Sequence, residues 1–129
     1  MGMSDKKILI IDDDEKSREN IRIPLVLRGY EVFEASDGFT GIRLARKHRP
    51  KVVLLDLLLP KVDGFRVARI LKFDKRFQEM RFIAVTQLVR EEIEDEIKRF
   101  GFDMLVKKPF VPEEFVQQIE PFYRGEAQV

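Results

Sequence analysis

Six side chains that can take part in phosphoryl chemistry each follow a short apolar segment of the sequence. They are Asp12, Asp13, Asp14, Asp56, Thr86 and Lys108. Unit charges of like sign about 4 Å apart repel by about 1 kcal/mol in water and about 4 kcal/mol at an effective dielectric constant of 20. Carboxylates that lie together therefore require a cation. Oxygen ligands without histidine or cysteine favour a hard ion, which makes Mg²⁺ the expected metal.

A magnesium ion held by a few carboxylates keeps positions open for phosphate oxygens. Lys108 would then supply a second positive charge, and the Thr86 hydroxyl could donate to a phosphoryl oxygen. Metal and lysine together stabilise charge on a phosphoryl group during transfer. Asp56 is the expected nucleophile, because the apolar run before it orients its carboxylate. These residue types predict phosphoryl transfer to an aspartate.

Whether these side chains meet depends on the elements that carry them. Short apolar segments rich in β-branched residues predict five strands. They are Ile8–Ile11, Tyr30–Ala35, Val52–Leu55, Phe82–Val85 and Met104–Val106. Apolar residues at helical spacing follow each strand and predict five helices, the first over about 16–28. Asp14, Asp63 and either Ser36 or Asp37 stand where helix N-caps are expected.

The connections between the predicted strands are too long for hairpins, so the strands are expected to be parallel, with helices on both faces. The expected fold class is α/β, a doubly wound sheet of five parallel strands in the order 2-1-3-4-5. Ligands bind such sheets at the carboxyl ends of the strands, near the point where strand order reverses. This order brings the acidic residues, the threonine and the lysine to one edge.

Composition narrows the class of protein. The chain has 129 residues, enough for one domain, and no cysteine, which excludes disulfide scaffolds, thiolate metal sites and cysteine nucleophiles. A formal net charge of +1 gives no overall field toward nucleic acid or acidic membranes. No apolar stretch reaches the roughly 18 residues of a membrane span. We therefore expect a cytoplasmic domain that contacts neither membrane nor nucleic acid directly.

Four motifs make the sequence similar to a known family. They are ILIIDDDE (8–15), VVLLDLLLPKVDG (52–64), IAVT (83–86) and GFDMLVKKPF (101–110). Together they resemble the receiver domain of two-component response regulators, over residues 6–123, with short tails at 1–5 and 124–129. The resemblance implies a flavodoxin-like fold with the strand order given above.

The resemblance also assigns roles around the metal. Asp56 would be the phosphoacceptor. Asp13, Asp56 and the backbone carbonyl of Leu58 would bind Mg²⁺ directly, and Asp12 would assist through a water molecule. Thr86 would hold the phosphoryl group and take part in the switch.

Lys108 would pair with the phosphoryl group, and the Lys108–Pro109 bond is expected to be cis, as is usual in the family. The donor would be a histidine kinase or a histidine phosphotransfer protein. Phosphorylation would change which downstream protein binds the surface formed by the fourth helix, fifth strand and fifth helix. Such a domain is not an enzyme in the ordinary sense, because it would catalyse only its own phosphorylation and dephosphorylation.

The main alternative is a pseudo-receiver, a protein-interaction module with this fold but without phosphorylation. Leu105 in place of an aromatic residue and Gln87 in place of a small one favour it slightly. An enzyme of the haloacid-dehalogenase type is disfavoured, because it needs a second aspartate where Leu58 stands.

Two further expectations concern leucines and a histidine. Leu58 and Leu88 stand where the family lines the path of the hydrolysing water, and neither can orient water, so we expect slow loss of phosphate. The single histidine, His48, lies among cations and is expected to be a solvated residue at a helix end.

Overall fold

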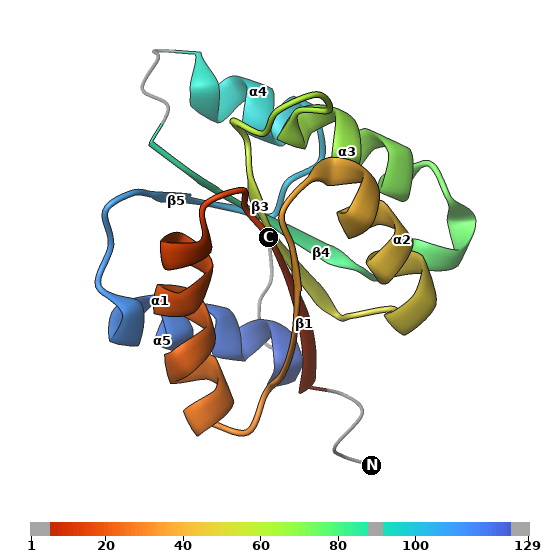
Figure 1. Cartoon of the computed structure of the whole chain (residues 1–129). Coiled ribbons are helices and arrows are strands. Elements are labelled where there is room, and N and C mark those ends of the chain that lie inside the picture. Colours follow the sequence, from red (N-terminus) through yellow and green to blue (C-terminus); the bar gives the residue numbers. More distant parts are fainter. Residues whose placement is uncertain (1–5, 88–91, 125–129) are drawn as a thin grey trace.

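A computed structural model describes residues 6–87 and 92–124 and shows a five-stranded sheet covered by helices on both faces (Figure 1). The strands are β1 (Lys7–Ile11), β2 (Glu31–Ala35), β3 (Val52–Asp56), β4 (Arg81–Thr86) and β5 (Met104–Lys107). The helices are α1 (Glu15–Leu27), α2 (Gly38–His48), α3 (Gly64–Lys72), α4 (Ile93–Arg99) and α5 (Pro112–Arg124), with a short 3-10 helix, η2, at Lys75–Phe77.

The strands follow the order β2-β1-β3-β4-β5, and every neighbouring pair is parallel. The predicted fold class and strand order are therefore confirmed. Each strand limit agrees with the sequence prediction to within one residue. No helix in the described ranges combines the length and the apolar character needed to cross a bilayer.

Alternate residues of each central strand face two separate apolar layers. In β1, Leu9 and Ile11 pack with residues of α2, α3 and α4, whereas Ile8 and Ile10 pack with residues of α1 and α5. All four side chains are buried. A parallel sheet covered on both faces needs apolar residues at every position, which explains the continuous apolar segments in the sequence.

Aspartates begin three of the helices as expected. Asp14, Asp37 and Asp63 each accept a hydrogen bond from the backbone N–H three residues later. Of the two candidates before α2, Asp37 is thus the cap. Each cap satisfies one of the free N–H groups at a helix start, and so fixes the point where the chain leaves the sheet edge.

His48 ends α2, as expected, but it is half-buried instead of fully solvated. Its ring stacks on Phe33 of β2, with centroids 4.0 Å apart and planes 16° from parallel. The last turn of α2 lies over the edge strand of the sheet, so the histidine packs on that strand instead of facing only solvent.

Candidate functional site

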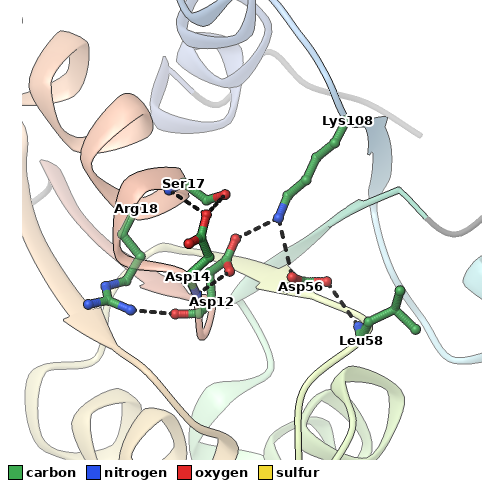
Figure 2. A network of polar contacts seen from close by, with 7 residues as sticks. All are labelled: Asp12, Asp14, Ser17, Arg18, Asp56, Leu58 and Lys108. Atoms are coloured by element: carbon green, nitrogen blue, oxygen red, sulfur yellow. Dashed lines mark hydrogen bonds and ion pairs between the residues drawn. The ribbon is translucent and has the colours of Figure 1, made fainter.

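Two buried carboxylates lie at the carboxyl ends of neighbouring strands (Figure 2). Asp12 follows β1 and is 2% exposed, and Asp56 ends β3 and is 7% exposed. The exposed Asp13 completes the group, because one carboxylate oxygen from each of the three residues lies within 4.8 Å of the others. The convergence expected from the strand order is present for these three acidic residues.

Lys108 joins the two buried carboxylates. Its Nζ lies 2.7 Å from Oδ2 of Asp12 and 3.2 Å from Oδ2 of Asp56 (Figure 2). The lysine follows β5, at the far side of the sheet from β1, and its extended side chain reaches back over the edge. One ammonium group therefore neutralises part of an acidic cluster built from distant parts of the chain.

Burial and charge act in opposite directions on these groups. Burial raises the pKa of Asp56, and the Leu58 N–H and the Lys108 ammonium only partly oppose it. Burial alone would lower the pKa of Lys108, but the hydrogen bond to Asp12 and the charge of Asp56 raise it overall. The Lys108 ammonium is thus held in its charged form, while the charge of the Asp56 carboxylate is unfavourable.

The backbone after β3 fixes the Asp56 carboxylate. The backbone N–H of Leu58 donates to Oδ1 of Asp56 over 2.9 Å. The N–H of Gly64, at the start of α3, donates to the Leu57 carbonyl over 3.2 Å. A Cβ on Gly64 would lie 2.6 Å from the Asp56 carbonyl oxygen and 2.8 Å from Cα of Leu57, so this close approach requires glycine.

The Asp12 backbone is held from the other side by a contact that the sequence analysis missed. Arg18 of α1 donates to the Asp12 carbonyl over 2.6 Å and to the Glu34 carboxylate over 3.0 Å. Arg22, one turn further along α1, also pairs with Glu34, at 2.8 Å. Arg18 and Arg22 are four residues apart and so lie on the same face of α1. This spacing is the sequence signal that could have suggested their pairing with Glu34.

Asp14 does not belong to the acidic cluster. Its Oδ2 accepts from both the backbone N–H and the hydroxyl of Ser17, at 3.1 and 2.8 Å (Figure 2). These two hydrogen bonds lower the pKa of Asp14. Its backbone N–H, in contrast, donates to Oδ1 of Asp12 over 2.9 Å and helps to orient that carboxylate.

Thr86 is fully buried at the end of β4, opposite Lys107 of β5. Its carbonyl oxygen accepts a hydrogen bond from the backbone N–H of Lys108 over 2.8 Å. The Lys108–Pro109 bond is cis, as expected. Thr86 therefore connects the strand beside Asp56 to the segment that carries the lysine.

The residues that depart from the pattern of the resembled family differ in their exposure. Leu58 is 49% exposed and Gln87 is exposed, whereas Leu105 packs partly buried against the apolar layer of α4. Leu88 lies outside the described residues.

The donor set of the cluster suits a hard divalent cation. Three carboxylates supply oxygen ligands, one of them exposed to solvent, and the cluster contains no nitrogen or sulfur ligand. Such a set matches the preference of Mg²⁺ for few carboxylates plus water and phosphate oxygens. A divalent cation would also balance the negative charge of the three carboxylates that the single Lys108 ammonium does not neutralise.

The chain spans about half the length of one similar curated protein and nearly all of another. The first is the DNA-binding dual master transcriptional regulator RpaA of Synechocystis sp., 39% identical over 92% of this chain and 49% of that protein. The second is the polar-differentiation response regulator DivK of Brucella anthropi, 32% identical over 95% of this chain and 98% of that protein.

Solved structures agree with these relatives. The chemotaxis response regulator CheY4 of Vibrio cholerae superposes with a TM-score of 0.84 at 27% identity, covering 90% of this chain and 97% of that one. The BeF3-activated DrrB receiver domain gives a TM-score of 0.81 at 28% identity, covering 92% and 97%. The family model for the response regulator receiver domain matches residues 8–120. The chain therefore belongs to the receiver-domain family of the response regulators of two-component systems.

Proposed function

We propose that Asp56 of this chain accepts a phosphoryl group in a Mg²⁺-dependent reaction. Receiver domains in general are switched by phosphorylation, bind Mg²⁺ at an acidic aspartate cluster and are not ordinary enzymes. The observation that carries the proposal here is the position of Lys108, whose Nζ touches both buried carboxylates. The arrangement places a fixed cation beside the acceptor, where a transferred phosphoryl group needs one.

The proposed metal ligands are Asp13, Asp56 and the carbonyl of Leu58, with Asp12 acting through a water molecule. When bound, Mg²⁺ would supply positive charge for the oxygens of the transferring group. The carboxylates of Asp12 and Asp13 lie within reach of the acceptor carboxylate, which supports this assignment.

The transfer forms one bond and breaks another. An Asp56 carboxylate oxygen attacks phosphorus while the P–N bond to the donor histidine breaks, and the electron pair stays on the imidazole nitrogen. Lys108 holds positive charge beside the attacking group throughout. Catalysis in this proposal is limited to the domain's own phosphorylation and dephosphorylation.

Thr86 is the proposed link to the output surface formed by α4, β5 and α5. A phosphoryl group adds about one negative charge at Asp56. The Thr86 hydroxyl would donate to that group, and Lys108 would pair with it. Movement at the end of β4 would then reach β5, because the Thr86 carbonyl already accepts from the Lys108 backbone.

Receiver domains interact with histidine kinases or histidine phosphotransfer proteins. We propose such a protein as the phosphoryl donor of this chain and an unidentified protein as its downstream target. The domain limits 6–123, the cytoplasmic location and the absence of direct contact with nucleic acid or membrane stay predictions from the sequence.

The test is incubation with acetyl phosphate and Mg²⁺, followed by intact-mass measurement. Wild-type protein should gain the mass of one phosphoryl group in Mg²⁺ and not in EDTA, and Asp56→Asn should gain none. Asp63→Asn, which changes an exposed helix cap in the same chemical way, is the matched control and should react like wild type. An adduct that survives Asp56→Asn, or no Mg²⁺-dependent adduct at all, would favour the pseudo-receiver.

A further inference from the structure

The basic residues of the chain are concentrated in one segment of the sequence. Between residues 38 and 76 the sequence holds eleven lysine or arginine residues and three aspartates, a formal charge of +8, although the whole chain carries +1. This segment includes α2 and α3, which lie side by side, with α4 on the other side of α3 (Figure 1). The basic residues carried by α2 and α3 are therefore brought near one another by the packing of these two helices.

A hollow of about 970 Å³ lies over the outer face of α3. Arg46, Arg66 and Arg69 line it together with apolar side chains. The apolar members include Phe65, which packs against Phe100 after α4 at a centroid distance of 4.9 Å. We call this hollow the α3 groove.

Phe73 is the most exposed large apolar residue of the described chain, at 89%. It lies at the end of α3 and also borders a smaller cavity of about 390 Å³, which Lys72 and Arg99 help to line. Exposed aromatic side chains beside apolar hollows mark interaction sites more often than single scattered residues do.

No ion pair to an acidic side chain is found for Arg66 or Arg69 among the described residues, whereas the charge of Arg46 acts on the neighbouring Asp74. The two aspartates of the groove are already engaged. Asp63 caps α3, and Asp74 pairs with Arg76 at 2.7 Å, which lowers the pKa of Asp74 to about 2. The guanidinium groups of Arg66 and Arg69 are thus available to carboxylates from another molecule.

We propose that the α3 groove binds an acidic polypeptide segment that carries a bulky apolar side chain. Apolar residues in the hollow and arginines around them match protein interfaces, where aromatic residues and arginine dominate binding. Guanidinium groups bind carboxylates in a bidentate manner, which adds orientation to charge. Neither Asp56 nor Lys108 takes part, so this site does not rest on the proposed phosphorylation.

Two other anionic partners fit the observations less well. Nucleic-acid interfaces are polar and rely on phosphate contacts, whereas the α3 groove has an apolar lining of Phe65, Ile70 and Phe73. An anionic bilayer is a broad surface, and it cannot fill a hollow flanked by helices. A polypeptide segment can place a side chain inside the hollow and carboxylates around it.

The probe is a fluorescein-labelled peptide of repeated Glu-Glu-Phe-Glu units, titrated with the full chain and followed by anisotropy. We expect Arg66→Glu/Arg69→Glu to weaken binding by about tenfold or more, because two attractive contacts become repulsive. Phe73→Ser should weaken it by about threefold or more. Lys47→Glu/Lys75→Glu is the matched control, since it changes the charge of the basic segment equally but outside the groove, and it should stay within about twofold.

Wild-type amide shifts in an NMR titration provide the second measurement, and they should move around residues 63–74. A peptide of Glu-Glu-Ser-Glu units should bind more weakly than the phenylalanine peptide. Equal loss of binding in the control variant, equal binding of the serine peptide, or no binding of the phenylalanine peptide would overturn the proposal. If oligo-dT or phosphatidylglycerol vesicles bound through Arg66 and Arg69 more tightly than the phenylalanine peptide does, the proposal that the partner is a polypeptide would be overturned.

Discussion

Replacing Asp56 with asparagine is expected to stabilise the protein when divalent cations are absent. One carboxylate oxygen each from Asp12, Asp13 and Asp56 lies within 4.8 Å of the others. At an effective dielectric constant of about 20, the buried Asp12 carboxylate at 4.8 Å disfavours the Asp56 charge by about 3.5 kcal/mol, whereas the exposed Asp13 is screened by water and adds little. The Lys108 ammonium at 3.2 Å favours that charge by about 5 kcal/mol.

The two charges together favour the Asp56 carboxylate by about 2 kcal/mol, but its burial, which costs several kcal/mol and is the largest cause of its raised pKa, outweighs them and leaves the charge unfavourable by about 2 kcal/mol. Urea denaturation followed by circular dichroism at pH 7 in EDTA should therefore give Asp56→Asn a free energy of unfolding about 2 kcal/mol above wild type. Asp63→Asn should lie within about 0.5 kcal/mol of wild type, because its carboxylate is exposed.

The sign of the pH effect follows from the raised pKa of Asp56. The carboxyl group protonates more readily in the folded protein, so the destabilisation is present above this pKa and disappears as the pH falls through it. The gap between variant and wild type should close in acid, and it should narrow in Mg²⁺, which binds the wild-type cluster better. A variant that is less stable than wild type at pH 7 in EDTA would refute the reasoning.

Four further outcomes are expected. Gly64→Ala should lower the free energy of unfolding by about 1–3 kcal/mol in urea denaturation, because its Cβ meets backbone atoms; unchanged stability would contradict this. Lys108→Met should cost about 3–5 kcal/mol at pH 7 in EDTA and less at pH 4, since two buried carboxylates lose their cation; a loss independent of pH would argue against it. Purified phosphorylated Leu58→Asn should lose phosphate several-fold faster than the parent, and an equal or slower rate in the variant would reject the role of Leu58. Burial raises the pKa of Tyr30 to about 12 and raises that of Tyr123 as well, so absorbance at 295 nm should show tyrosinate below pH 11 only if the protein unfolds.

The meeting of the site residues at the strand ends could be predicted, because each strand is marked by its own apolar run in the sequence. Apolar runs fix the strands, strand order fixes which ends are neighbours, and Asp12, Asp56 and Lys108 meet for that reason. The N-caps Asp14 and Asp63 are equally local, since each acts within its own first helical turn.

Contacts between a helix and a strand could not be predicted in the same way. Arg18 reaches Glu34 and the Asp12 carbonyl only because α1 lies over β1 and β2 at one particular rotation. His48 stacks on Phe33 because the end of α2 lies over β2. Its charged neighbours in the sequence suggest a solvated side chain instead. Periodicity tells which face of a helix is apolar, but not which polar side chain on its border meets which strand residue.

Helix α4 is short and is held mainly by the packing of its apolar residues. It has seven residues, and its first turn has no side-chain cap among the described residues. At the other end Phe100 packs on Phe65, and the backbone N–H of Phe102 donates to the Ile97 carbonyl. Ile93 in the first turn and Ile97 in the next are both buried in the apolar layer beneath the helix. Because packing and not a side-chain cap fixes the start of α4, a shift in that apolar layer would reposition the whole helix.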